Sequence, residues 1–169
     1  LFLDDLYAEL EKHENNYKKL QVLQLRLGEI KIFDPACGSG NFLIIAYKEL
    51  RRLEMELLKR LQAIEDKKVE SQIFTPFSEI KLSQFYGIEL DDFAHEVAML
   101  SLWLAEHQMN IEFKTEFGDC PPTLPLTTGG NIIQGNALRS NWSILCPNDS
   151  DDEVYLLGNP PYIGGTLQS

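Results

Sequence analysis

Short apolar segments that alternate with long helical stretches constrain this chain more than any other feature of its sequence. Four segments of four or five residues have the length and apolar content of strands. They are residues 29–33, 85–88, 131–134 and 154–157. Apolar residues recur with helical spacing over 42–64 and from about 92 to 109. This alternation predicts an α/β fold with a mostly parallel sheet.

Residues 1–28 are predicted to form an N-terminal helical segment that precedes the sheet. Leucines between Leu3 and Leu27 follow helical spacing, and Gly28 is expected to end the helix. Asn41 is expected to cap the next helix, because an Asn side chain can accept a hydrogen bond from the first helical turn.

The helix predicted from residue 92 to Met109 is apolar on most of its sides. This composition predicts that the helix is well buried. Asp91 or Asp92 can cap its first turn. The stretches 67–83 and 114–130 are less regular and contain proline, so both are expected to be connections without regular structure.

Ligands bind beyond the carboxyl ends of parallel strands, so the loops after the four strands are expected to form one site. The first loop reads Asp-Pro-Ala-Cys-Gly-Ser-Gly over residues 34–40. Gly38 and Gly40 allow a tight turn and a close approach of the backbone to a ligand. No Lys-Ser or Lys-Thr pair follows, which excludes a phosphate-binding P-loop. The carboxylate of Asp34 instead suits a cation, such as the ammonium group of a methionine moiety.

Polar side chains also follow the second and third strands. An acidic residue at the end of a second strand is placed to bind ribose hydroxyls, and here that residue is Glu89. Asn136 offers both a donor and an acceptor, which suits N6 and N1 of an adenine. The same Gly-Asn pair is also ordinary turn chemistry. Asp91 and Asp92 are interpreted as helix caps rather than ligands.

The fourth strand ends in the sequence Gly-Asn-Pro-Pro-Tyr, residues 158–162. Pro160 and Pro161 have a fixed φ, which sets the direction of the neighbouring carbonyl groups. Two such carbonyls and the amide oxygen of Asn159 can accept hydrogen bonds from an exocyclic NH₂ group. Tyr162 offers a flat face on which an extruded base can stack. This loop is therefore the candidate catalytic loop.

In their order and spacing, the first and fourth motifs resemble those of the amino-methylating DNA methyltransferases. The resemblance extends from about Ile32 to Gly165, in the arrangement where the cofactor motif precedes the catalytic one. Gly-Asn-Ala-Leu-Arg and Asn-Pro-Pro-Tyr-Ile-Gly resemble, more narrowly, the large fused restriction-modification enzymes. Asn136 departs from the pattern, since many relatives have Asp there.

The resemblance implies a Rossmann-like class I methyltransferase sheet, of which residues 29–169 are the N-terminal half, truncated after the catalytic loop. It implies direct transfer of a methyl group from S-adenosyl-L-methionine to N6 of adenine. The implied catalytic residues are Asn159, Pro160, Pro161 and Tyr162. The implied cofactor-binding residues are Asp34, Pro35, Ala36, Cys37, Gly38, Gly40, Phe42, Glu89, Leu90, Asn136, Ala137 and Asn159.

The charge of the chain argues against duplex binding by this segment alone. Residues 85–169 hold 2 Lys or Arg and 12 Asp or Glu, a net charge of −10 out of −11 for the whole chain. Phosphate contacts need basic side chains. The resemblance implies that a target recognition domain, missing from this chain, binds the double-stranded DNA. An acidic catalytic half is then tolerable, because the basic surface lies elsewhere.

The cysteines and histidines of the chain indicate its cellular location and whether it holds a metal site. Three scattered cysteines without a CxxC pair argue for a reducing compartment, so a cytoplasmic location is expected. Three dispersed histidines without neighbouring cysteines predict no metal site. No apolar run approaches the roughly 20 residues that a bilayer span needs, so no membrane association is expected.

Several alternatives stay open on the sequence alone. An Asn-Pro-Pro-Tyr loop serves any planar NH₂ group, so N-methylation of protein glutamine and N4-methylation of cytosine are both compatible with it. An alternative of another class is an inactive cofactor-binding fragment or assembly module.

Overall fold

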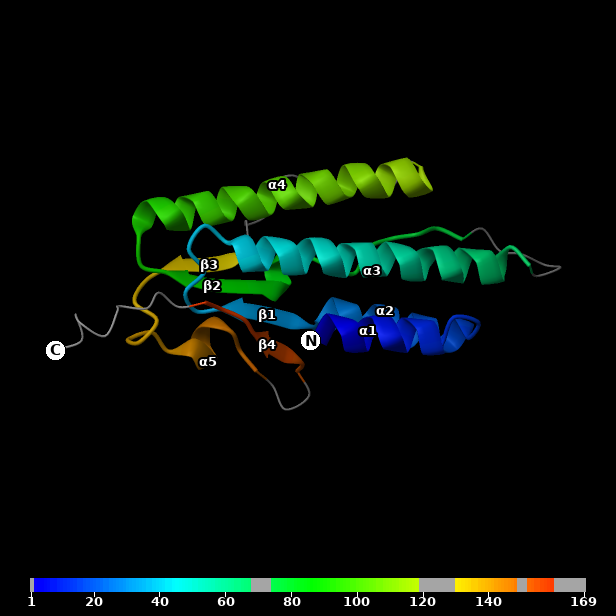
Figure 1. The fold of residues 1–169 in the computed structure, drawn as a ribbon, viewed down its shortest axis with the longest axis horizontal. Helices are drawn as coiled ribbons and strands as arrows, with labels where there is room; N and C mark the ends of the chain where they lie inside the picture. Colours follow the sequence, from blue (N-terminus) through cyan, green and yellow to red (C-terminus); the bar gives the residue numbers. More distant parts are fainter. Residues whose placement is uncertain (1, 68–73, 119–129, 149–151, 160–169) are drawn as a thin grey trace.

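The computed structural model describes residues 2–67, 74–118, 130–148 and 152–159 (Figure 1). Two helices precede the first strand, and two long helices separate the first three strands. In chain order the elements are α1 (Phe2–Lys12), α2 (Tyr17–Glu29), β1 (Lys31–Asp34), α3 (Asn41–Glu65), η1 (Leu82–Gln84, a 3-10 helix), β2 (Phe85–Glu89), α4 (Asp92–Phe117), β3 (Asn131–Gln134), α5 (Trp142–Leu145) and β4 (Val154–Leu156).

The four strands form one parallel sheet in the order β3-β2-β1-β4. Ile32 of β1 is aligned with Phe85 of β2 on one side and with Tyr155 of β4 on the other. The strand order reverses at β1, which is the switch point where ligands bind in open α/β sheets. The predicted parallel, Rossmann-like α/β fold is therefore confirmed.

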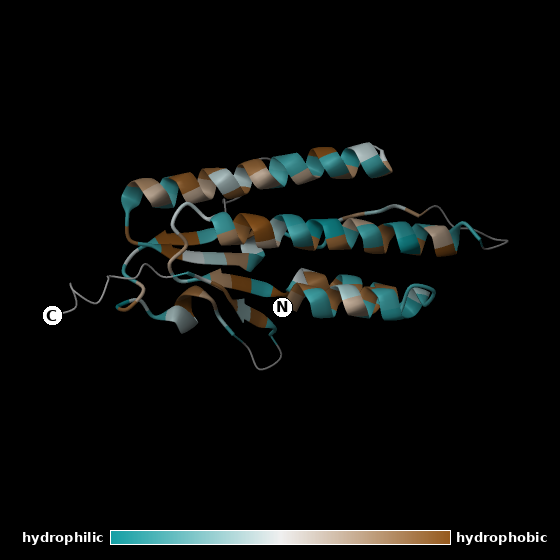
Figure 2. Ribbon diagram, in the orientation of Figure 1, coloured by the Kyte–Doolittle hydropathy of each residue, from teal (hydrophilic) through white to brown (hydrophobic). Residues whose placement is uncertain are grey.

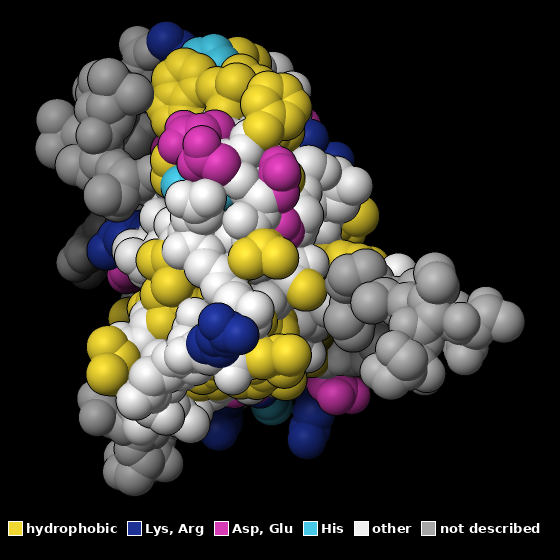
Figure 3. Space-filling view, turned by 90° about the vertical axis from the view of Figure 1, so that its left-hand side faces the viewer, with side chains coloured by type: hydrophobic (Ala, Val, Ile, Leu, Met, Phe, Trp, Pro, Cys, Tyr) yellow, Lys and Arg dark blue, Asp and Glu magenta, His cyan; other side chains and the backbone are white. Residues whose placement is uncertain are grey.

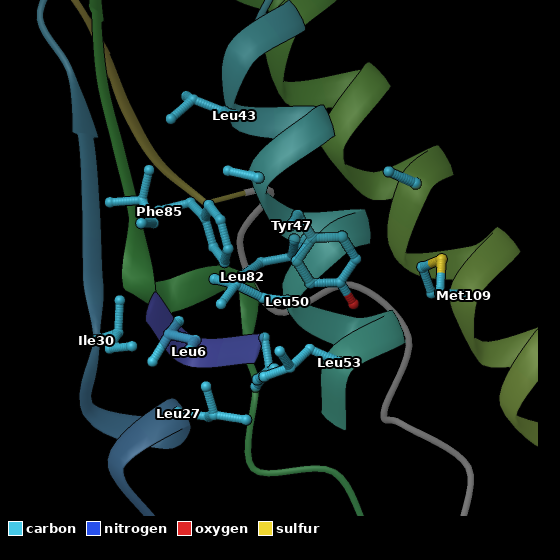
Figure 4. Close-up of a cluster of buried hydrophobic side chains, with 14 of the residues drawn as sticks. Leu6, Leu27, Ile30, Leu43, Tyr47, Leu50, Leu53, Leu82, Phe85 and Met109 are labelled. Atoms are coloured by element: carbon cyan, nitrogen blue, oxygen red, sulfur yellow. The ribbon is translucent and has the colours of Figure 1, made fainter. Parts of the chain in front are cut away.

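The main core lies between the sheet and the long helices. Leu43, Tyr47 and Leu50 of α3 lie in the same cluster as Phe85 of β2, and the ring centroids of Tyr47 and Phe85 are 5.3 Å apart (Figure 4). Leucines of α1 and α2, among them Leu6, belong to the same cluster. Brown residues in the strands and along the helices mark this core in Figure 2. Burial of this apolar surface is the main force that holds the helices on the sheet.

The opposite face of the sheet carries a much smaller cluster. Because side chains alternate along a strand, Ile32 faces the main core while its neighbour Phe33 faces the other side. There Phe33 packs with Ile88 and Cys146, next to the short helix α5. This helix was not predicted, since four residues are too few to establish a helical period.

The predicted N-terminal helical stretch is two helices instead of one. Asn16 caps α2, and its side chain accepts a hydrogen bond from the backbone N–H of Lys19 at 3.2 Å. Gly28 lies inside α2 and does not end it. A Cβ at this position would come within 2.9 Å of the Cβ of Glu79. Close packing against residue 79, not helix capping, accounts for this glycine.

The two predicted helix caps have different outcomes. Asp91 caps α4 as expected, because its side chain accepts a hydrogen bond from the N–H of Ala94 at 2.8 Å. Asn41, however, is the first residue of α3, and Gly40 occupies the cap position with a φ of 82°. This left-handed conformation favours glycine over asparagine.

Helix α4 is longer and more exposed than predicted. It continues past Met109 to Phe117 and ends at Gly118, whose φ is 84°. One face of the helix is buried, and it consists of Ala98, Leu102, Ala105, Met109 and Phe113. The prediction of a well buried helix is wrong for the opposite face, where Phe93 is 78% exposed and Leu100 is 55% exposed. Among the helices of the described residues, none is long and apolar enough to cross a bilayer.

Candidate functional site

Asp34 is the last residue of β1, and its side chain is fully buried. One carboxylate oxygen, Oδ1, accepts a hydrogen bond from the N–H of Ala36 at 3.0 Å. The other, Oδ2, is buried and has no hydrogen-bond partner among the residues that the structure describes. Burial raises the pKa of Asp34; the Ala36 bond opposes this shift, and nearby Glu89 adds to it. A buried carboxylate with one unpaired oxygen is a site that a cation would stabilise.

The loop after Asp34 is held close to the sheet. The N–H of Cys37 donates to the carbonyl of Ile88 in β2 at 3.1 Å, and the N–H of Gly40 donates to the carbonyl of Cys37 at 2.8 Å. Gly38 has a φ of 54°, which favours glycine. A Cβ at Gly40 would come within 3.3 Å of the Cβ of Ala98 in α4. The loop therefore turns between β2 and the first turns of α4.

The thiol of Cys37 has a structural environment, not a reactive one. Its side chain is buried, and a Cβ on Gly87 would lie 2.9 Å from its sulfur. Burial, with smaller contributions from Asp34 and Glu89, raises the pKa of Cys37 to about 12. A neutral thiol is a poor nucleophile. Sequence reasoning missed this contact, although a glycine inside a strand signals close approach of another group.

Glu89, at the end of β2, joins two loops. Its Oε2 accepts a hydrogen bond from the N–H of Gly38 at 2.7 Å, and its Oε1 accepts one from the N–H of Asp91 at 2.9 Å. The structure thus brings Glu89 against the glycine loop, as its predicted position requires. These two bonds were not predicted. Leu90, which follows, is 67% exposed.

Asn136 lies in the loop after β3, next to the end of β2. The N–H of Gly135 donates to the backbone carbonyl of Glu89 at 2.8 Å, which ties the two loops together. The side chain of Asn136 is exposed, and its Oδ1 accepts a hydrogen bond from the N–H of Leu138 at 3.0 Å. Its ordinary turn role is therefore present. Ala137 packs against the smaller core cluster.

The end of β4 lies directly beside the end of β1. The N–H of Leu157 donates to the carbonyl of Phe33 at 2.8 Å, which continues the pairing of the two strands. At the next residue, a Cβ on Gly158 would lie 3.1 Å from Oδ1 of Asp34. Asn159 follows and is exposed. The backbone that leads into the predicted catalytic loop therefore touches the predicted cofactor carboxylate.

The remaining predicted site residues are distributed as follows. Pro35 and Ala36 are half-buried in the first loop, and Phe42, in the first turn of α3, is 46% exposed. Pro160, Pro161 and Tyr162 lie outside the described residues.

The structure has two other features: a groove away from this edge of the sheet and a cluster of possible metal ligands beside it. A groove of about 670 Å³ runs between α2, α3 and residues 74–79, and Leu25 and Phe77 line it. It touches none of the predicted site residues. Within the described ranges, Asp92, His95 and Glu96 bring possible metal-ligating atoms within 4.8 Å of one another. Both carboxylates are exposed, and we assign no metal to them.

Comparisons with known proteins agree with the sequence and the fold. DNA methyltransferase A of Bacillus subtilis (strain 168) is 52% identical over the whole chain, which spans 19% of that protein. A putative type II restriction enzyme and methyltransferase of Methanocaldococcus jannaschii is 38% identical over 61% of the chain and 8% of its own length. The chain therefore spans a fifth or less of these relatives.

A solved structure gives the same result. The type IIL restriction-modification enzyme MmeI, solved in complex with DNA, is 40% identical with a TM-score of 0.85, over 100% of this chain and 22% of that one. Residues 10–169 match the family described as MmeI, DNA-methyltransferase domain. With its parallel sheet and its glycine loop at the switch point, the chain belongs to this family of DNA-methyltransferase domains.

Proposed function

We propose that this chain is the cofactor-binding and catalytic half of a DNA methyltransferase that methylates N6 of adenine, as part of a restriction-modification enzyme. One observation carries the proposal. The pairing of β4 with β1 brings the backbone of Gly158 against Asp34, so the loop that begins at Asn159 starts beside the glycine loop. A methyl donor and an acceptor amine held by these two loops would be adjacent.

The residues at this edge fit S-adenosyl-L-methionine as the cofactor. Within the described part of the chain, Oδ2 of Asp34 is a buried acceptor without a partner, and the ammonium group of a methionine moiety would supply one. Glu89 lies at the second strand end, where a carboxylate can accept hydrogen bonds from ribose hydroxyls. Asn136, on the third loop, is exposed and can face an adenine edge. When bound, this cofactor supplies an activated methyl group.

The chemistry of the chain itself is positioning. The amide oxygen of Asn159 accepts a hydrogen bond from the exocyclic amine of the target base. This bond draws the nitrogen lone pair out of conjugation with the ring and makes it a better nucleophile. The carbonyl of Pro160 would accept the second hydrogen, and Tyr162 would stack on the base. No residue forms a covalent intermediate, and the raised pKa of Cys37 keeps its thiol neutral.

DNA binding is proposed for a region outside this chain. The net charge of −10 after residue 84 opposes contact with phosphates. The relatives are about five times as long as this chain, which leaves room for a target recognition domain. A cytoplasmic location is proposed because the three cysteines are scattered in the sequence and form no CxxC pair.

A radiolabelled methyl-transfer assay tests the proposal. The full-length protein should methylate duplex DNA, and digestion should yield N6-methyladenine. The Asn159→Ala variant should lose methyl transfer to DNA. Val22→Ala, on the exposed side of α2, is the control and should retain activity. N4-methylcytosine as the product, or methylation of a glutamine-containing protein substrate instead of DNA, would replace the proposed acceptor.

The isolated chain of residues 1–169 should not methylate DNA. Holding an unstacked base costs a few kcal/mol, and stacking on one tyrosine returns only about 1–3 kcal/mol. Phosphate contacts from elsewhere must cover the difference. Methylation of duplex DNA by this fragment alone, dependent on Asn159, would show that the DNA contacts lie within it.

A further inference from the structure

Helix α4 carries apolar residues on two opposite faces, and the residues that the structure describes cover only one of them. The covered face packs against α3, η1 and strands β2 and β3. On the other face, Phe93, Leu100, Leu104 and Ile111 are 78%, 55%, 43% and 54% exposed. A helix that is apolar all round is normally buried all round, but this 26-residue helix has neighbours on one side only among the described ranges.

The four exposed apolar residues of α4 and the half-buried Val97 form a single line. Phe93, Val97, Leu100, Leu104 and Ile111 are separated by four, three, four and seven residues, and we call this line the α4 seam. Alternating steps of three and four keep side chains on one stripe that another helix can pack against. Figure 3 shows hydrophobic side chains gathered over this part of the molecule, with acidic side chains beside them.

Charges along the seam favour a basic neighbour. The helix carries five acidic residues, Asp92, Glu96, Glu106, Glu112 and Glu116, and one lysine, Lys114. All but Glu106 of the acidic side chains are exposed. Glu116 is already paired with Lys59 of α3 at 2.8 Å. The carboxylates of Asp92 and Glu96 lie close together at the start of the seam.

A second copy of the chain would be a poor occupant of the α4 seam. Two copies of this helix, each with five acidic residues and one lysine, would repel each other, and charges beside the apolar stripe decide which helices pair. A helix with lysine or arginine beside an apolar stripe would pair with Asp92 and Glu96 while it covers the apolar residues.

We propose that the α4 seam is the docking surface for a basic amphipathic helix, supplied by the part of the full-length polypeptide outside this chain. The chain spans only 19% and 22% of two relatives, so most of a polypeptide of that length would lie outside it. A helix tethered in the same chain needs less contact area than a separate partner, because its effective concentration is high. This inference does not depend on the reaction proposed above.

Photo-crosslinking in the full-length protein identifies the occupant. With p-benzoylphenylalanine in place of Leu104, irradiation should give an intramolecular product whose second peptide lies outside residues 1–169 and carries an apolar stripe with excess lysine or arginine. A dimer-sized product, or a second peptide that is acidic or lies within residues 1–169, would overturn the proposal.

Cysteine labelling measures whether the seam is covered. Leu100 of α4 is 55% exposed, and Leu25 of α2 is 58% exposed. Each is replaced by cysteine in a separate variant. In the full-length protein, Leu100→Cys should react with a maleimide about ten-fold or more slowly than the same protein in denaturant, as expected for an opening of at least 1.4 kcal/mol. Reaction of Leu100→Cys at the denatured rate would overturn the proposal, whatever the rate at Leu25.

Reversing the charges of Asp92 and Glu96 tests whether the segment that covers the α4 seam is basic. Asp92→Lys with Glu96→Lys should raise the labelling rate of Leu100→Cys several-fold, because both substitutions repel a basic neighbour. The control pair Asp92→Asn with Glu96→Gln should have a smaller effect. An unchanged rate in the lysine variant would mean that the occupant is not basic.

Discussion

Replacing Asp34 with asparagine should separate cofactor binding from stability. The substitution keeps an oxygen that can accept the hydrogen bond from the N–H of Ala36, now 3.0 Å from Oδ1. It replaces the buried, unpaired Oδ2 with an NH₂ group. Against an ammonium group, this change removes a charged hydrogen bond worth about 1.5–3 kcal/mol. We therefore expect S-adenosylmethionine to bind about 10- to 150-fold more weakly.

The same substitution should not destabilise the protein without cofactor. Burial raises the pKa of Asp34, so the ionised form is disfavoured in the folded state. Removing this charge should leave the thermal midpoint unchanged or raise it. Calorimetric titration with S-adenosylmethionine and a thermal melt without it, both on the full-length protein, measure the two effects. Unchanged affinity together with a lower midpoint would show that Asp34 has a structural role only.

The pH dependence of binding follows from the same carboxyl group. Because the pKa of Asp34 is raised above 3.8, the group takes up a proton at pH values where an ordinary aspartate is ionised. A proton and an ammonium group compete for it, so affinity should fall as the pH falls through this pKa, by about ten-fold per pH unit below it. The affinity of the Asp34→Asn variant should not fall in this way at low pH. An identical fall in the variant would assign the titration to the cofactor or to another residue.

Three further substitutions test neighbouring features. Glu89→Ala should weaken S-adenosylmethionine binding by about 1–3 kcal/mol, measured by calorimetry, and unchanged affinity would remove Glu89 from the ribose site. Gly87→Ala places a Cβ 2.9 Å from the sulfur of Cys37 and should lower the free energy of unfolding in urea by about 1–3 kcal/mol. Adding Cys37→Ala to the same protein should partly restore this stability. The Arg51 side chain is 2% exposed, and its Nε lies 3.5 Å from Oε2 of the buried Glu54. Arg51→Met should cost about 3–5 kcal/mol in the same assay, and a loss below 1 kcal/mol would contradict the importance of this ion pair.

The location of the site was predictable because it depends on short-range patterns. Each of the four strands is a short apolar segment that ends at a polar residue or glycine. Once the strands are parallel, their carboxyl ends must share one edge. Asp34, Glu89, Asn136 and Asn159 could therefore be assigned to that edge from their sequence positions alone. The bonds of Glu89 to Gly38 and Asp91 could not, because they depend on loop conformation.

The features that sequence reasoning missed depend on contacts between distant segments. Gly28 resembles a helix-ending glycine, but its requirement comes from Glu79, 51 residues away. The exposed face of α4 is apolar like its covered face, so composition alone could not show which one the described residues cover. Asn41 has the right chemistry for a cap, but Gly40 adopts the left-handed backbone that the turn requires.

The position of β1 between β2 and β4 also sets the order in which this edge can be completed. Lys31 is paired with Val154, a separation of 123 residues along the chain. At about 5–20 residues per second, a ribosome needs roughly 6–25 s to synthesise that interval. During that time one edge of β1 has no strand beside it, and an unpaired edge invites pairing with other chains. Asp34 and Gly158 can therefore meet only after this interval, and chaperones that shield an exposed strand edge should matter most while it lasts.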